Sequence, residues 1–217
     1  MCANALGITD LGHGGKIAAG FIAVISGYAA SYFTALCAAP KKRYSIIKST
    51  VIFIFVFYII VLVDFTLIDD NLGRNIFSIY NWNTTAFSDY INRNTNIVPF
   101  ATVRLFINAV KTSALPLYAV LENLLGNLAA FMPLPFFLPC LFKRFNNWYS
   151  VLITVLLSVI TVEMLQLLFL TGSSDIDDVI LNTAGAMLLY GVLRIKGVSR
   201  FISKITFGVW ETENGKD

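Results

Sequence analysis

The 217-residue sequence has few charged residues, one histidine and three cysteines. Asp, Glu, Lys and Arg make up 13% of the chain, whereas roughly a quarter of an average soluble domain is charged. Cys2, Cys37 and Cys140 have neither the spacing of a disulfide framework nor that of metal ligands. These features disfavour a soluble globule, a disulfide-stapled domain and a zinc site, and we predict neither a metal nor a cofactor.

The positive charge is also too scattered for a nucleic-acid partner. The chain has sixteen Lys and Arg residues against thirteen Asp and Glu residues, and the basic residues occur in short runs between apolar stretches. Such runs offer no basic face along which a phosphate backbone can lie. Since 57% of the residues are hydrophobic, the composition instead predicts an integral membrane protein.

Five apolar stretches predict transmembrane helices. A helix needs about 20 residues to cross the hydrocarbon core, and four stretches reach this length while one is shorter. We predict spans at 17–39, 46–68, 116–142, 148–171 and 177–195. In the long loop before the third span, residues 96–110 have apolar side chains at helical spacing, which is compatible with an interfacial or re-entrant helix and also with a plain amphipathic surface helix. The predicted fold class is therefore an all-α polytopic membrane protein.

The basic residues set the expected orientation. They cluster at 41–48, 143–144 and 194–204, and the positive-inside rule places these three segments in the cytoplasm. The N-terminus and the loop at 69–115 are then outside, and the C-terminus is inside. Apolar residues that alternate with basic ones after the last span predict a cytoplasmic amphipathic tail at 196–217.

Carboxylates and amides within the apolar spans need an explanation, because a charge at the bilayer centre costs about 2.5 to 3.5 kcal/mol on insertion scales. The orientation, which depends only on Lys and Arg, places all of these polar groups in the outer half of the membrane or at its surface. Spacings of three or four residues also put them in pairs on shared helix faces. We predict one candidate polar site for substrate binding or another function, made of Glu122, Asn123, Asn127, Glu163, Gln166, Asp175, Asp177, Asp178 and Asn182.

Several of these residues also have structural interpretations. The amides are suited to interhelical hydrogen bonds, worth about 0.6 kcal/mol each on average. The three aspartates at 175–178 are suited to capping the start of the last span. They carry oxygen ligands of the kind that Mg²⁺ and Ca²⁺ take, but not the spacing of a calcium loop. Pro133, Pro135 and Pro139 predict a kink or break in the third span, with freed carbonyls that need partners.

Four segments carry a resemblance to a known family. They are "NIVPF" at 96–100, "ENLLGNLAAFMPLPFFLP" at 122–139, "VEMLQ" at 162–166 and "GSSDIDDVILNTAG" at 172–185. In this order and spacing the chain resembles the VanZ-like family of bacterial membrane proteins, named for a member associated with resistance to the glycopeptide teicoplanin. The resemblance implies that the family's recurring positions are Pro99, Asn123, Asn127, Pro133, Glu163, Gln166, Asp175, Asp178, Asn182 and Gly185.

The sequence departs from the family pattern at two places. Pro135 replaces a glycine of the family, which alters the expected kink. Ser173 and Ser174 stand where many members have an arginine, so Arg93 or Arg104 from the outer loop would have to supply that charge. We divide the chain into an N-terminal two-span region with the outer loop (1–95), a VanZ-like domain (96–195) and the cytoplasmic tail (196–217).

The resemblance implies a phenotype, glycopeptide resistance, and leaves three hypotheses for the mechanism. The favoured one is a membrane factor at the outer leaflet that binds or alters a cell-envelope lipid or wall precursor. Its expected partners are membrane lipids and a lipid-linked precursor or glycopeptide. The second is a membrane-embedded enzyme whose carboxylates perform acid–base or metal-assisted chemistry on a lipid-linked substrate. The third is a small transporter or channel, for which five unequal spans without an internal repeat are weak evidence.

Overall fold

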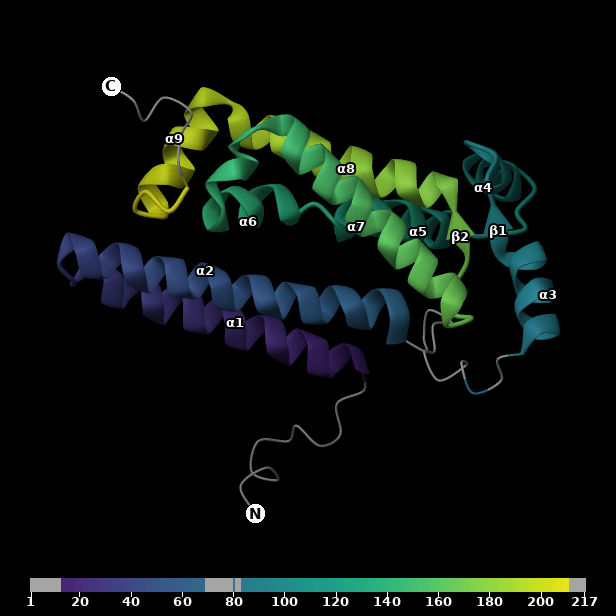
Figure 1. Cartoon of the computed structure of the whole chain (residues 1–217), viewed down its shortest axis with the longest axis horizontal. Helices are drawn as coiled ribbons and strands as arrows, with labels where there is room; N and C mark the ends of the chain where they lie inside the picture. The colour runs from purple at the N-terminus through teal and green to yellow at the C-terminus, as the bar shows by residue number, and fades with distance from the viewer. Residues whose placement is uncertain (1–12, 69–79, 81–82, 211–217) are drawn as a thin grey trace, which may run out of the picture.

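The computed structural model describes residues 13–68, 80 and 83–210, and in this part the chain is almost entirely helical (Figure 1). Most of the long helices lie roughly along one axis, and α5 runs obliquely to it. Their bounds are α1 His13–Leu36, α2 Pro40–Val63, α5 Leu117–Ala130, α7 Trp148–Leu168 and α8 Ile176–Arg194. The shorter elements are the π-helix η3 Asp64–Ile68, α3 Thr84–Asn94, β1 Thr95–Asn96, α4 Ala101–Lys111, α6 Leu134–Leu141, the 3₁₀ helix η6 Lys143–Asn146, β2 Ser174–Asp175 and α9 Lys196–Ile205.

Four helical segments of the described chain are long and apolar enough to cross a membrane. They are Pro40–Ile68, Leu117–Leu141, Trp148–Leu168 and Ile176–Arg194, and the apolar part of α1, Gly20–Leu36, is shorter. The prediction of an all-α polytopic membrane protein is confirmed. We call the end where α2 and α7 finish and α8 begins the α4 end, and the opposite end the α9 end (Figure 1).

The third apolar stretch is broken into two helices, as its prolines predict. α5 ends at Ala130, and α6 begins after Pro133, whose missing N–H cannot continue the ladder of α5. The break leaves the Ala130 carbonyl in need of a donor. Tyr58 of α2 supplies it, with 2.8 Å between its hydroxyl oxygen and the carbonyl oxygen. A partner from another span therefore stabilises the kink.

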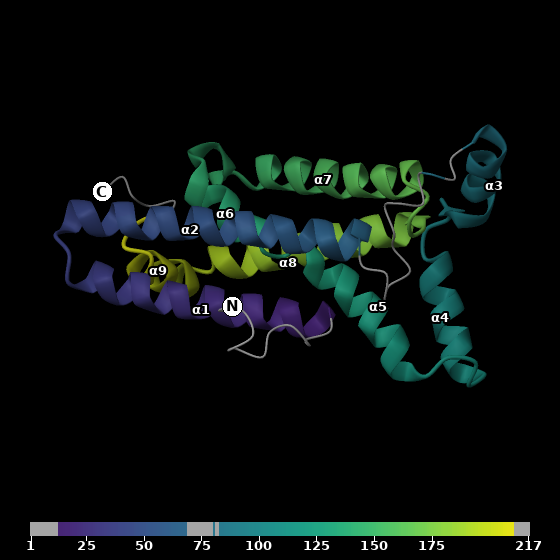
Figure 2. The ribbon, with the colours of Figure 1, turned by 90° about the horizontal axis from the view of Figure 1, so that it is seen from below.

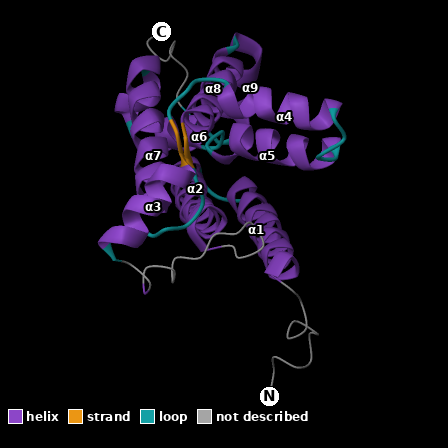
Figure 3. Ribbon diagram, turned by 90° about the vertical axis from the view of Figure 1, so that its right-hand side faces the viewer, coloured by secondary structure: helices purple, strands orange, loops and turns teal. Residues whose placement is uncertain are grey.

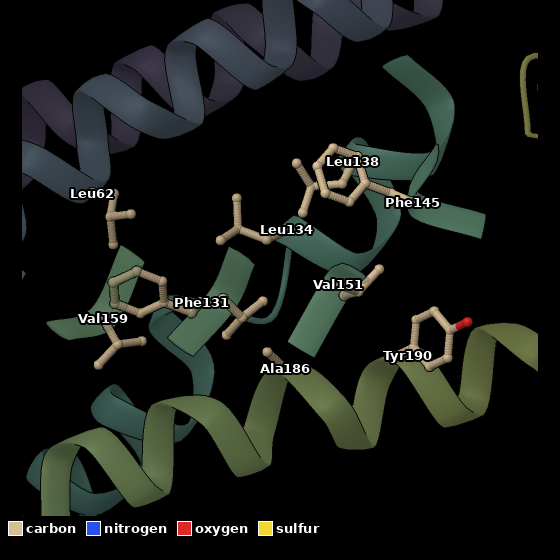
Figure 4. Packing of buried hydrophobic residues seen from close by; sticks show 10 residues of the cluster. Leu62, Phe131, Leu134, Leu138, Phe145, Val151, Val159, Ala186 and Tyr190 are labelled. Atoms are coloured by element: carbon tan, nitrogen blue, oxygen red, sulfur yellow. The ribbon is translucent and has the colours of Figure 1, made fainter. Parts of the chain in front are cut away.

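The main apolar core joins α2, the α5–α6 break, α7 and α8 (Figure 4). Since lipid is as apolar as these side chains, close packing, more than removal from water, holds the helices together. The buried members are Leu62, Phe131, Leu134, Leu138, Phe145, Val151, Val155, Val159, Ala186 and Tyr190.

Small elements cover the α4 end. Figures 2 and 3 show α4 lying across the long axis of the bundle and extending to one side together with the start of α5. This is the helix predicted from residues 96–110, although it begins only at Ala101. The sequence reading missed α3 and the parallel pairing of β1 with β2 (Thr95 with Ser174, Asn96 with Asp175).

At the α9 end the chain turns back on itself. The predicted amphipathic helix is present as α9, and Trp210, which lies beyond it, is fully buried. Positive φ angles at Phe207 and Gly208 redirect the chain, and the Trp210 indole N–H donates to the Ser199 hydroxyl at 3.0 Å. Residues 211–217 of the predicted tail lie outside the described residues.

Candidate functional site

A polar pocket lies between the end of α2, α5, α7 and α8, toward the α4 end. It is small, with a cavity volume of about 10 Å³ and a mouth open to the surroundings. Its polar lining consists of Thr66, Asn127, Glu163, Gln166, Asp178 and Asn182. Its apolar lining consists of Phe65, Ala130, Phe131 and Val162. The structure thus brings together five of the nine residues predicted for the polar site.

The α5–α8 side of the pocket is a chain of hydrogen bonds. The side-chain amide of Asn127 in α5 donates to the carboxylate of Asp178 in the first turn of α8. The side-chain nitrogen of Asn182, one turn further along α8, donates to the Asp178 carbonyl at 2.8 Å. Because these residues come from two spans, the pocket geometry depends on how α5 and α8 cross.

That crossing is very close. A Cβ atom built on Gly185 would lie 1.8 Å from the carbonyl oxygen of Leu128, so only glycine fits there. Gly185 is three residues from Asn182, and Leu128 follows Asn127 directly. The small residue therefore sets the spacing at which Asn127 meets Asp178.

Asn182 has an acceptor without a donor. Its side chain is 4% exposed, and its Oδ1 is buried and receives no hydrogen bond. The amide cannot turn over, because Oδ1 would then face the Asp178 carbonyl oxygen that its nitrogen now contacts. An unpaired buried acceptor costs about 1 to 3 kcal/mol, so this oxygen is suited to a donor from outside the chain.

The α7 side supplies Glu163 and Gln166, both buried. Glu163 accepts a hydrogen bond from the backbone N–H of Asp175 at 3.2 Å. Gln166 donates to the Thr66 carbonyl at 2.8 Å. Thr66 lies in the π-helix that ends the second span, and such irregular turns expose carbonyls that a regular α-helix would use internally.

Phe65 and Thr66 are pocket residues that the sequence reading missed. The sequence signal available for this region was the polar pair Asp64 and Thr66 near the end of an otherwise apolar stretch.

Asp175 and Asp177 serve a different purpose from Asp178. Asp175 caps α8 by accepting from the Asp177 N–H at 2.8 Å, and it also accepts from Asn96 and Thr102. Thus the N-capping interpretation holds for Asp175. The carboxylate of Asp177 accepts from the backbone N–H groups of Phe100 and Val103 at the start of α4. These two aspartates tie the segment before α4, and the start of α4 itself, to the first turn of α8.

A tyrosine of α3 holds the loop before β2 in place. The hydroxyl of Tyr90 in α3 donates to the Gly172 carbonyl, and burial raises the pKa of this hydroxyl, so it stays protonated. Gly172 has a φ of +74°, and a Cβ atom built on it would lie 3.3 Å from the Gln166 side chain. The loop is thereby placed over the α7 side of the pocket.

Glu122 and Asn123 do not line the pocket. Both side chains are exposed on the first turns of α5, where that helix diverges from the bundle (Figure 2). Arg93 and Arg104, expected to replace the family's arginine, are also exposed and are not pocket residues. Within the described residues the lining contains no Lys, Arg or His.

The family model described as VanZ/LLP1 matches residues 55–197, about two thirds of the chain. The chain belongs to the VanZ/LLP1 family. No curated protein and no solved structure is significantly similar to it. As a VanZ-type protein it is a multi-pass membrane protein of a family linked in general to glycopeptide resistance.

The VanZ/LLP1 match confirms the family resemblance and extends it toward the N-terminus. It begins at residue 55, within α2, whereas the resemblance covered only residues 96–195. The second half of α2 and η3 therefore lie inside the matched region. These are the segments that bring Phe65 and Thr66 to the pocket.

Proposed function

We propose that this VanZ-type protein binds the polar head of a cell-envelope lipid or lipid-linked wall precursor at the outer leaflet, and so lowers susceptibility to teicoplanin. The observation that carries the proposal is the convergence of Asn127, Glu163, Gln166, Asp178 and Asn182 on one pocket. Interhelical hydrogen bonding accounts for amides, but it does not require carboxylates among them.

The distribution of charge supports placing this pocket on the outer side. The start of α2 with Arg43, the α6–α7 connection with Arg144, and α9 all gather at the α9 end (Figure 1). By the positive-inside rule that end faces the cytoplasm, which puts the pocket and α4 near the outer headgroups. Leu105 and Ile107 of α4 are 61% and 48% exposed, as suits a helix lying in the interface.

The packing between the pocket and the α9 end favours binding over transport. Along α7, buried Val159, Val155 and Val151 follow Glu163 toward the α9 end. Along α8, Ala186 and Tyr190 follow Asn182 in the same direction. A substrate passing through would have to cross this close-packed layer (Figure 4).

The test is a teicoplanin susceptibility assay in a bacterium that lacks the protein. Glu163→Gln and Asn182→Ala are expected to abolish the protection while the protein stays in the membrane at its normal level. Glu122→Gln and Asn123→Ala are matched controls, because they change the same residue types outside the pocket, and they are expected to keep the protection. Full protection by both pocket variants would refute the proposal, whereas loss of folded protein in both would assign these residues to helix packing.

A further inference from the structure

One exposed face of α9 carries three basic residues in a row. Lys196, Arg200 and Lys204 follow one another at intervals of four residues, so they share one side of the helix, and all three are exposed. Like charges at this spacing destabilise a helix, so a counter-charge on this face stabilises it. We call these three residues the α9 basic stripe.

The opposite face of α9 holds the helix against the bundle. Ser199 accepts from the Trp210 indole N–H at 3.0 Å, and Ile202 packs against the apolar cluster that contains Trp210. Figure 1 shows α9 lying across the long axis at the end of the bundle. A helix in this position runs along the surface of a membrane that the long helices cross, with its basic stripe turned away from the core.

No carboxylate of the described residues lies at the α9 end. The aspartates and glutamates of residues 13–68, 80 and 83–210 all belong to the half of the molecule toward the α4 end, and they are Asp64, Asp89, Glu122, Glu163, Asp175, Asp177 and Asp178.

Arg194 adds to the unbalanced positive charge beside the stripe. Among the described residues its guanidinium donates only to Asn146, and its buried Nε and Nη1 have no hydrogen-bond partner. The rings of Tyr190 and Trp210 lie 5.0 and 5.4 Å from the guanidinium carbon, and neither carries a negative charge. The counter-charge for this end therefore comes from outside the described residues.

Exposed aromatic side chains indicate that the α9 end lies at the depth of the lipid headgroups. Trp148 and Tyr149 begin α7 at this end and are 55% and 56% exposed, and Phe201 of α9 is 62% exposed. Trp and Tyr are enriched where the hydrocarbon core meets the headgroups. A lipid brings acyl chains that cover such side chains, whereas a small soluble anion does not.

We propose that the α9 basic stripe binds the phosphate groups of anionic phospholipids, of the phosphatidylglycerol class, in the leaflet next to α9. Charge complementarity carries the proposal, since each Lys or Arg close to an anionic membrane surface strengthens binding about fivefold. A choline lipid offers a phosphate whose charge its own ammonium group cancels. The stripe lies at the opposite end from the pocket, so the inference does not depend on the proposed function.

The first experiment measures lipid preference on the purified full chain. Phosphatidylglycerol and phosphatidylcholine with identical acyl chains compete for the protein in detergent, and native mass spectrometry measures the bound ratio. We expect phosphatidylglycerol to be preferred by tenfold or more, and added salt to lower this preference because it screens exposed charges. Equal binding of the two lipids would overturn the inference.

Substitutions then locate the preference on α9. Replacing all three residues of the α9 basic stripe with Gln is expected to reduce it to less than twofold. The matched control, Arg93→Gln with Arg104→Gln and Lys111→Gln, removes three exposed charges at the α4 end and is expected to keep it, because that end also carries the carboxylates. Equal loss in both triple variants would refute the stripe as the site. Should the first fail to fold, Arg200→Gln alone is expected to lower the preference about fivefold, and an unchanged ratio would refute the site.

Two further arms test other sources of counter-charge. Inorganic phosphate at millimolar concentration is expected to leave phosphatidylglycerol bound, whereas full displacement would make the ligand a soluble anion and overturn the assignment to a lipid. Glu211 and Glu213 follow the described residues and are carboxylates of the chain itself. Glu211→Gln with Glu213→Gln is expected to keep the lipid preference within twofold, and a severalfold increase would show that these carboxylates, rather than a lipid, neutralise the stripe.

Discussion

Replacing Gly185 with alanine tests the helix crossing on which the pocket depends. The added Cβ would lie 1.8 Å from the Leu128 carbonyl oxygen, whereas ordinary contact begins at 3.4 Å, so α5 and α8 must separate by roughly 1.6 Å. Overpacking of this kind costs about 1 to 3 kcal/mol, and here both sides of the clash are backbone, which favours the upper part of the range. The same displacement would break the hydrogen bond between Asn127 and Asp178.

Thermal unfolding in detergent measures the effect, and Gly191→Ala in the same helix is the control. The Gly191 position has no atoms within 4 Å of an added Cβ, and alanine favours a helix over glycine by about 1 kcal/mol. We expect Gly185→Ala to lower the melting temperature by several degrees and to lose teicoplanin protection, and Gly191→Ala to be neutral or stabilising. If the two variants had the same melting temperature, the close crossing of α5 and α8 described above would be refuted.

Three further predictions concern other parts of the fold. In intact cells an impermeant thiol reagent should label Thr85→Cys but not Lys42→Cys, and the reverse pattern would invert the proposed orientation. Asp177→Ala should speed hydrogen exchange at the Phe100 amide and destabilise the start of α4 by about 1 kcal/mol, whereas unchanged exchange would show that the carboxylate is not its cap. Arg194→Lys should lower the melting temperature, since lysine cannot reproduce the guanidinium stacking at 5.0 Å from the Tyr190 ring; an unchanged value would make that stacking energetically unimportant.

Hydropathy and residue type were sufficient to predict the broken helix and four of the five expected spans, while the first, at 17–39, corresponds to the shorter apolar helix Gly20–Leu36. Apolar length identifies transmembrane segments because the bilayer fixes that length, and Pro133 stops α5 because it lacks an N–H. Depth and helix-face spacing also selected Asn127, Gln166 and Asn182, which the structure brings to one pocket. Apolar length, proline position, depth and helix-face spacing depend only on the local sequence and on the membrane. They can therefore be obtained without knowing how the helices pack.

The directions of the helices and the irregular turns could not be predicted from the sequence. Asn123 and Asn127 share a helix face by spacing, yet only Asn127 reaches the pocket, because α5 diverges from the bundle toward its start (Figure 2). The Thr66 carbonyl of the π-helix accepts from Gln166 of α7, 100 residues away, and the β1–β2 pair also joins segments far apart in the chain. Asp175 and Asp177 look like Asp178 in sequence, and only their partners distinguish caps from pocket residues.

The order in which the spans are synthesised determines when the hydrogen bonds of the pocket can form. The hydrogen bond from Gln166 to Thr66 joins positions 100 residues apart, and that from Asn127 to Asp178 joins positions 51 apart. Since α8 is made after α5 and α7, Asn127 and Glu163 enter the membrane before their partners at Asp178 and Asp175 exist. The hydrogen bonds of Asn127 with Asp178 and of Glu163 with the Asp175 backbone can therefore form only once the last span has been made, so the pocket is completed last.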